Sequence, residues 1–137
     1  MPEITGVLET ALYVGNVGRS ADFYQSLFDF EVMVQDERFC ALNVAGKQVL
    51  LLFGRGSTLV PLTVPGGIIP PHDGAGQMHF AFSIPAAALP AWEARLAAHS
   101  IAIESKVAWP RGGYSVYFRD PDSHLVELAT PGIWPIY

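Results

Sequence analysis

The chain has 137 residues, half of them apolar, which is enough to bury the core of one domain without disulfides. It carries 8 Lys and Arg against 13 Asp and Glu, and this net charge of −5 disfavours nucleic acid or an anionic membrane as a partner. A single cysteine, Cys40, excludes an intramolecular disulfide, and its apolar neighbours predict that it is buried. No basic stretch precedes an apolar run at the N-terminus, and the longest apolar run, 49–53, is too short to cross a bilayer. We therefore predict a cytoplasmic protein with a small-molecule partner.

The first half of the chain predicts a strand, a helix and three further strands. Residues 7–14 alternate as a strand with two different faces does. Apolar residues then recur every three or four positions, which predicts a helix with Asn16 as its N-cap and an end near Asp29. Short strands are expected at 30–35, 39–44 and 47–53, with a tight turn at Ala45 and Gly46 between the last two.

The second half repeats this order. A strand is expected at 78–84, a helix at 90–99, and strands at 103–108, 115–119 and 125–129. The repeat predicts two βαβββ modules, and so an α+β fold. We expect one domain over 1–137, with module one at about 5–53, a linker loop at 54–77 and module two at about 78–130.

The linker, 54–77, is rich in proline and glycine. A structureless connection of this length is uncommon in a compact domain and usually serves as a lid, a binding loop or a linker. We expect it to cover a pocket or to cross between subunits. A plain surface linker is the alternative.

Polar residues stand at regular places in the predicted central strands. His79 lies on the face opposite Phe80 and Phe82, which are expected to pack under a helix. The same alternation turns Glu9, Tyr117 and Glu127 away from the helices, and the sequence therefore predicts a pocket lined by Glu9, His79, Tyr117 and Glu127.

Carboxylates in apolar strands are costly to bury unless they are paired or bind a cation. Glu9 and Glu127 with a neutral His79 suit a divalent ion such as Mn²⁺, Fe²⁺, Ni²⁺, Co²⁺ or Zn²⁺, and open positions would remain for water and substrate. Tyr117, or a carboxylate released from the metal such as Glu127, would move a proton during catalysis. In the alternative interpretation Glu9 and His79 bond to each other or to backbone, and Glu127 is a solvated residue at a strand end.

Three segments of the chain carry a resemblance to a known family. Leu12 to Phe30, with its Tyr-Val-Gly-Asn and Arg-Ser-Ala-Asp-Phe-Tyr stretches, resembles the opening β-α-β of glyoxalase, bleomycin-resistance and extradiol-dioxygenase proteins. Tyr117 to Leu128 is similar to their closing hairpin, and Gln77 to Phe82 also matches. This family is the vicinal oxygen chelate superfamily. The resemblance implies a cupped, partly open mixed sheet with helices on the outside, and a homodimer.

The resemblance also implies where metal ligands fall. The first-strand ligand of the family, commonly His, falls on Glu9, the next on His79 and the last on Glu127. A fourth ligand position of glyoxalase I falls near Leu51, an apolar residue. These positions imply a metal-dependent enzyme acting on a small substrate with vicinal oxygens, of lyase, isomerase or dioxygenase type.

A second hypothesis is a metal-free protein that sequesters a flat or cationic ligand, as in the bleomycin-resistance branch. Tyr13, Tyr117 and Trp109 would supply stacking surface, and Glu9 and Glu127 the negative charge. Under either hypothesis the residues expected to contact substrate are Tyr13, Leu51, Trp109, Arg111 and Ser115, with Arg111 meeting an anionic group at the pocket mouth. Residues 120–123 have the composition of a hairpin turn. His72 and His124 are expected to face solvent, and entry of either one into the site is the alternative.

Overall fold

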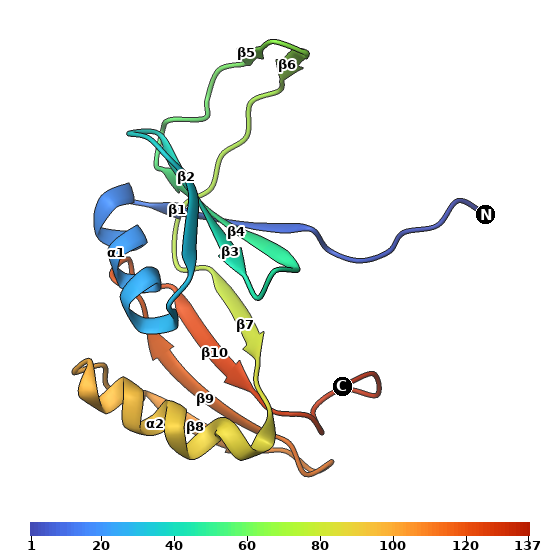
Figure 1. Ribbon diagram of the computed structural model, residues 1–137, viewed down its shortest axis with the longest axis vertical. Coiled ribbons are helices and arrows are strands. Elements are labelled where there is room, and N and C mark those ends of the chain that lie inside the picture. The colour runs from blue at the N-terminus through green and yellow to red at the C-terminus, as the bar shows by residue number, and fades with distance from the viewer. The chain divides into compact units, whose positions relative to one another are not determined.

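The computed structural model describes residues 1–137, and these form two units, Met1–Ala75 and Gly76–Tyr137 (Figure 1). Each unit contains a four-stranded mixed sheet with one long helix. The strand orders are β1-β4-β3-β2 in unit one and β7-β10-β9-β8 in unit two, which is the same topology used twice. The predicted α+β class with two βαβββ modules is confirmed.

Unit one follows the predicted order of elements, with boundaries that differ by at most two residues. Its core elements are β1 (Glu9–Val14), α1 (Val17–Phe28), β2 (Glu31–Gln35), β3 (Phe39–Val44) and β4 (Gln48–Gly54). Strand β1 pairs in parallel with β4, and the other neighbours are antiparallel. Leu8, expected in the first strand with its side chain on the core side, lies before β1 and is exposed.

Helix α1 begins and ends where the sequence predicts. The side chain of Asn16 accepts a hydrogen bond from the backbone N–H of Arg19 at 2.8 Å, and this satisfies one of the free N–H groups of the first turn. Asp29 ends the helix with φ of 58°. Tyr24 and Leu27 are fully buried on the face that packs on the sheet, and Cys40 is buried beneath them as predicted.

The linker is not structureless, which corrects the prediction. It contains a small hairpin of β5 (Leu62–Val64) and β6 (Gly67–Ile69), which Figure 1 shows projecting beyond the sheet of unit one. The residues on either side of Pro65 and Gly66 are mostly β-branched, and such residues favour strands while Pro-Gly favours a turn. The two strands have three residues each, too few to show alternation.

Unit two contains β7 (His79–Ser83), a 3₁₀ turn η1 (Ala86–Ala88), α2 (Leu89–Ala98), β8 (Ser105–Ala108), β9 (Tyr114–Arg119) and β10 (Leu125–Ala129). Strand β7 pairs in parallel with β10, which pairs with β9. Alternation along β9 and β10 is as predicted, because the side chains expected to pack under the helix are fully buried; these are Val116, Phe118, Val126 and Leu128.

The turn between β9 and β10 has the predicted chemistry but holds its histidine differently from the expectation. Asp120 Oδ1 accepts backbone hydrogen bonds from Asp122 and His124, each at 2.9 Å. His124 was expected to face solvent, but it is fully buried and its Nδ1 accepts the backbone N–H of Met78 at 2.9 Å. The backbone at Met78 needs an acceptor at the entry to β7, and the imidazole supplies it.

Residues 132–137 form a compact C-terminal hook. The backbone N–H groups of Gly132, Ile133 and Trp134 all point to the carbonyl oxygen of Tyr137, at 3.0 to 3.1 Å. The Tyr137 hydroxyl reaches the carbonyls of Ala129 and Ile84, at 2.9 and 3.2 Å. These bonds attach the hook to the ends of β10 and β7. None of the helices is long and apolar enough to cross a membrane.

Candidate functional site

Two of the candidate metal ligands lie side by side in unit two. His79 on β7 and Glu127 on β10 face the same side of neighbouring strands, and His79 Nε2 lies 3.3 Å from Glu127 Oε2. His79 Nδ1 lies 3.0 Å from the carbonyl oxygen of Leu125. A carbonyl only accepts hydrogen bonds, so Nδ1 carries the proton. A neutral His79 therefore presents the lone pair of Nε2 to the carboxylate.

A lone pair that faces a carboxylate oxygen repels it unless a proton or a cation lies between them. Two ligands that bind one ion at about 2.1 Å each, with a bond angle of roughly 90–110°, lie about 3.0–3.4 Å apart. The observed 3.3 Å falls within that interval. The distance between the two donor atoms therefore fits a divalent metal ion.

Glu127 is fixed from its other oxygen. The Ser115 hydroxyl donates to Glu127 Oε1 at 2.5 Å, and Trp109 Nε1 donates to Ser115 Oγ at 2.8 Å. Ser115 is fully buried and Glu127 is 7% exposed. This chain of two bonds occupies Oε1 and holds the carboxylate so that Oε2 faces His79. Ser115, predicted to contact substrate, is thus placed beneath the carboxylate.

A cavity of about 270 Å³ opens at this pair, and we call it the unit-two pocket. Its lining residues are His79, Trp109, Tyr117, Glu127, Ile133 and Trp134. The ring of Tyr117 lies 6.2 Å from that of His79. Burial raises the pKa of Tyr117, the hydrogen bond with Ser115 opposes this, and the charge of Glu127 raises the pKa further. Tyr117 therefore keeps its proton at neutral pH.

Two residues of the unit-two pocket were not predicted. Ile133 and Trp134 come from the C-terminal hook, which lies past the last expected strand. The one sequence signal was the apolar and aromatic character of 133–137 after Gly132. Arg111, predicted at the pocket mouth, is exposed in the turn between β8 and β9 and is not among the residues that line the unit-two pocket, so its role remains a prediction.

Glu9, the third predicted ligand, belongs to unit one and lines a larger cavity of about 660 Å³, which we call the unit-one pocket. The other lining residues are Ala11, Arg38, Phe39, Leu51, Phe53, Leu62, Val64, Ile69 and His72. No group of three His, Cys, Asp or Glu side chains that could hold a metal is present. Glu9 as a ligand therefore remains a prediction.

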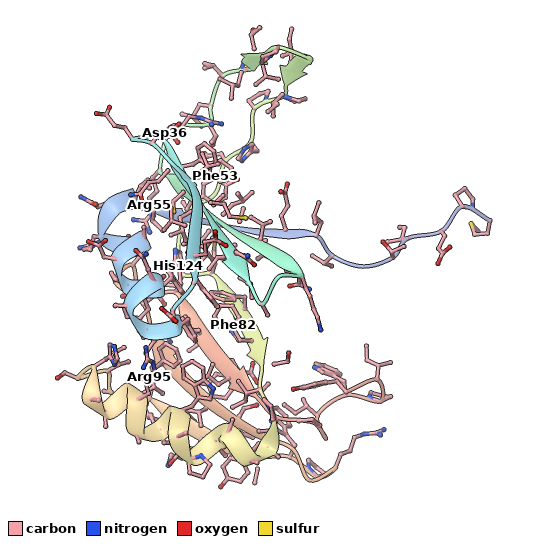
Figure 2. The ribbon with its side chains drawn as sticks, in the orientation of Figure 1. Asp36, Phe53, Arg55, Phe82, Arg95 and His124 are labelled. Carbon is pink, nitrogen blue, oxygen red and sulfur yellow. The ribbon has the colours of Figure 1, made fainter.

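Tyr13 lies behind the aromatic wall of the unit-one pocket. Its ring stacks on Phe53 with centroids 6.0 Å apart, and its hydroxyl lies 2.5 Å from His72 Nδ1. Phe53 is labelled in Figure 2, near the end of β4. His72 was expected to face solvent but is half-buried, because its segment folds back on the sheet. Burial, and secondarily the charge of Asp73, raise the pKa of Tyr13.

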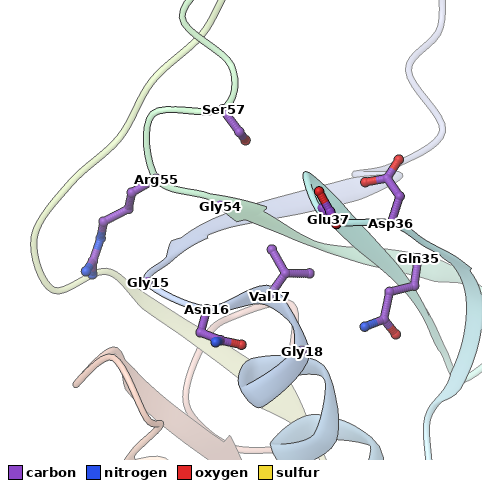
Figure 3. Close-up of a pocket in the computed structure, with 10 residues that line it drawn as sticks. All are labelled: Gly15, Asn16, Val17, Gly18, Gln35, Asp36, Glu37, Gly54, Arg55 and Ser57. Carbon is purple, nitrogen blue, oxygen red and sulfur yellow. The ribbon is translucent and has the colours of Figure 1, made fainter.

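A third hollow, of about 720 Å³, lies beside the start of α1 and is drawn in Figure 3. Its residues include Asn16, Asp36, Glu37 and Arg55, and Arg55 points away from the two acidic side chains. It is open and contains no residue of the predicted site. We assign it no role.

Pairing registers relate the two units residue by residue. Ala11 pairs with Leu51 across β1 and β4, and Ala81 pairs with Glu127 across β7 and β10. Glu9 and His79 stand two residues before these alanines, in the first strand of each unit. His79 therefore corresponds to Glu9, as predicted, and Glu127 corresponds to Leu51.

The same arrangement of strands and helices occurs in a known family. Residues 6–128 match the Glyoxalase/Bleomycin resistance protein/Dioxygenase superfamily. The chain belongs to this superfamily. The resemblance seen in the sequence is thereby confirmed over nearly the whole chain.

Individual superfamily members show how varied the relatives are. The metallothiol transferase FosB of Bacillus licheniformis is 27% identical over 96% of this chain and 79% of its own length. The catechol-2,3-dioxygenase of Bacillus subtilis is 29% identical over 92% of this chain but only 41% of its own length. A crystal structure of lactoylglutathione lyase from Agrobacterium tumefaciens has a TM-score of 0.88 at 31% identity, covering 98% of this chain and 99% of that one.

Proposed function

We propose that this superfamily member is a metal-dependent enzyme that acts on a small substrate with two neighbouring oxygen atoms. The supporting observation is the pair of His79 Nε2 and Glu127 Oε2 at 3.3 Å, with the imidazole lone pair directed at the carboxylate by the bond to Leu125. Glu9 is the third ligand of the proposal. The similarity to a metallothiol transferase, a dioxygenase and a lyase supports an enzyme, and the reaction is of lyase, isomerase or dioxygenase type.

The residues around the pair have separate tasks in this proposal. A divalent ion, when bound, would polarise the substrate oxygens and stabilise negative charge that develops on them. Ser115 and Trp109 keep Glu127 in place, so that the donor set needs little rearrangement. Tyr117, with its raised pKa, supplies a protonated hydroxyl at the wall of the pocket and can give a proton to a substrate oxygen.

Calorimetric titration of the chelator-treated chain with Mn²⁺, Ni²⁺ and Zn²⁺ tests the proposal. We expect one ion per site in the parent and at least a roughly tenfold weaker affinity in His79→Ala and Glu127→Gln. His99→Ala removes an exposed histidine on α2 and serves as the matched control. If both site variants bind metal as tightly as the control, the assignment is wrong. Glu9→Gln tests the third ligand separately.

A metal-free sequestering protein of the bleomycin-resistance type is the second candidate. The observation in its favour is the unit-one pocket, whose aromatic and aliphatic walls can hold a flat ligand without any metal. A protein purified without chelator that contains no metal, and that still binds a flat ligand, would favour this candidate over the enzyme.

We also propose where the protein is located and how many chains assemble. We place it in the cytoplasm as a homodimer, because members of the resembled family often pair their modules across a dimer. Light scattering after gel filtration measures the mass, and 14.9 kDa would identify a monomer and contradict the dimer.

A further inference from the structure

We propose that the unit-one pocket binds the aromatic or apolar body of an anionic substrate, with Arg38 as the residue that selects for the negative charge. The inference rests on the proposed function only in taking the ligand of this pocket to be the substrate. The preference of the pocket for an apolar anion is argued only from residues of unit one, and it does not depend on a metal site.

The walls of the unit-one pocket are apolar on two sides. The sheet contributes Phe39, Leu51 and Phe53, and the β5–β6 hairpin contributes Leu62 and Ile69. The volume of about 660 Å³ lies in the range of pockets that enclose a drug-sized ligand. Helix α1 packs on the sheet of unit one, against β3 and β4, and the hairpin and the segments that lead to it contribute to the wall of the pocket.

The hairpin is held in position at its base. The backbone N–H of His72 donates to Thr58 O at 3.0 Å, and the Thr58 hydroxyl donates to His72 O at 2.5 Å. The His72 ring contacts Phe53 edge-on with centroids 4.7 Å apart and bonds to Tyr13. These contacts close residues 58–72 into a loop anchored on the sheet. The pocket wall is therefore formed before any ligand arrives, which lowers the entropic cost of binding.

Arg38 provides the positive charge at this pocket. Its Cζ lies 5.5 Å from the ring centroids of both Phe39 and Phe53, and its Nε donates to the carbonyl of Ser57 at 3.3 Å. That bond is the one polar contact of the side chain, and no carboxylate forms an ion pair with it. The remaining guanidinium N–H groups are available for a carboxylate or phosphate, which a guanidinium binds with paired hydrogen bonds. A guanidinium stacked on aromatic rings beside an apolar cavity favours an anion with an aromatic body.

The pocket also includes Glu9, the third ligand of the proposed metal site. The carboxylate of Glu9 would repel an anionic group, so we expect the negative charge of the substrate at Arg38 and its body against Phe53 and Leu51. The substrate class proposed for this pocket is therefore an aromatic or apolar acid.

Binding of 2-naphthoate to the chelator-treated full chain, measured by calorimetry, tests the inference without metal. The neutral control is 2-naphthamide and the cationic control is 2-naphthylmethylamine. We expect the parent to bind naphthoate roughly tenfold or more tighter than the amide, and the amine more weakly still. Arg38→Gln should abolish the difference between naphthoate and amide, whereas Lys47→Gln, which removes an exposed charge from the β3–β4 turn, should not.

Two variants test the place of binding. Leu51→Trp should fill the pocket and prevent binding of all three compounds. Because Leu51 lies in a central strand, Ile69→Glu on the projecting hairpin is the second variant, and it should weaken naphthoate by placing a negative charge in the wall. Equal affinities for the three compounds, or naphthoate binding that survives both Arg38→Gln and Ile69→Glu, would overturn the inference.

The metal-site variant separates this inference from the proposed function. His79→Ala should lose metal affinity and keep naphthoate affinity. If metal affinity is unchanged in His79→Ala while the naphthoate results hold, the proposed function fails and the pocket assignment stands. If metal affinity falls and the naphthoate preference is absent, the reverse is true.

Discussion

The hydroxyl of Ser115 donates a 2.5 Å hydrogen bond to Glu127, a carboxylate on the neighbouring strand of the same sheet. The bond is fully buried and accounts for one of the two carboxylate oxygens. Through it, the indole of Trp109 contributes to the position of a proposed metal ligand that it does not touch.

Ser115→Ala should therefore destabilise the fold and weaken metal binding together. A buried carboxylate oxygen that loses its donor costs about 1–3 kcal/mol in the free energy of unfolding. Urea denaturation measures this cost, and Ser105→Ala, on the exposed face of β8, should change the same quantity by less than about 0.5 kcal/mol. Equal effects of the two substitutions would contradict the role given to the Ser115 bond.

Tyr13 should make the fold sensitive to alkaline pH. Its pKa in the folded chain lies above the ordinary value of 10.0, because burial and the charge of Asp73 disfavour the phenolate. Below that ordinary value Tyr13 is protonated in both states and its contribution is fully present. As pH rises, the unfolded chain loses the proton first, and stability falls until the folded pKa is passed.

The alkaline effect is checked by urea midpoints measured from about pH 8 to 11. Tyr13→Phe cannot ionise, so its midpoint should fall less steeply than that of the parent over the upper part of this range. The variant also loses the bond to His72 and should start from a lower midpoint at neutral pH. Parallel curves for the two proteins would show that Tyr13 does not contribute.

Gly113→Ala should release the C-terminal hook. A Cβ at Gly113 would lie 2.6 Å from the carbonyl carbon of Gly132, and that backbone is held by the Gly113 N–H to Gly132 O bond of 3.0 Å. Hydrogen exchange at the backbone amides of Ile133 and Trp134, which donate to the carbonyl oxygen of Tyr137, should accelerate in this variant.

A matched control for the hook is Gly46→Ala, because Gly46 has φ of +68° but no atom within 4 Å of an added Cβ. It should cost about 1–2 kcal/mol through backbone strain and leave the exchange of the Ile133 and Trp134 amides unchanged relative to global unfolding. An identical change in the exchange of these amides in both variants would mean that the close approach at Gly113 does not hold the hook.

His124→Phe should destabilise unit two although it keeps an apolar ring of similar shape. The substitution removes the acceptor of the Met78 N–H, which then lacks its partner at a half-buried position, at a cost of about 1 kcal/mol. Hydrogen exchange at Met78 should accelerate in the variant. Unchanged protection of that amide would show that another group replaces the imidazole.

Strand alternation was sufficient to predict that three residues of the unit-two pocket share a face of their sheet. His79, Tyr117 and Glu127 share a face because residues two apart in a strand point the same way, and the burial of Val126 and Leu128 fixes which face that is. Alternation does not predict the distance between side chains on neighbouring strands, so the hydrogen bond from Ser115 to Glu127 could not be predicted from it. The contact residue predicted at Ser115 instead lies under the carboxylate.

Contacts made by irregular segments were harder to predict. Trp134 lines the unit-two pocket because the C-terminal hook is held by backbone hydrogen bonds to the carbonyl oxygen of Tyr137. Such backbone bonds produce no periodic pattern in the sequence. His72 meets Tyr13 across 59 residues of sequence, through a hairpin whose strands are too short to alternate. Both residues depend on how a loop closes, which composition alone does not determine.

Leu51 and Glu127 stand at matching positions of the two modules, so one module has an apolar residue where the other has a carboxylate. An ancestral duplication that kept both strand frameworks would leave one module free to change its apolar contacts while the other retained its polar pair. Substitutions around Leu51 would then change the apolar wall of the unit-one pocket without changing the bonds that hold Glu127.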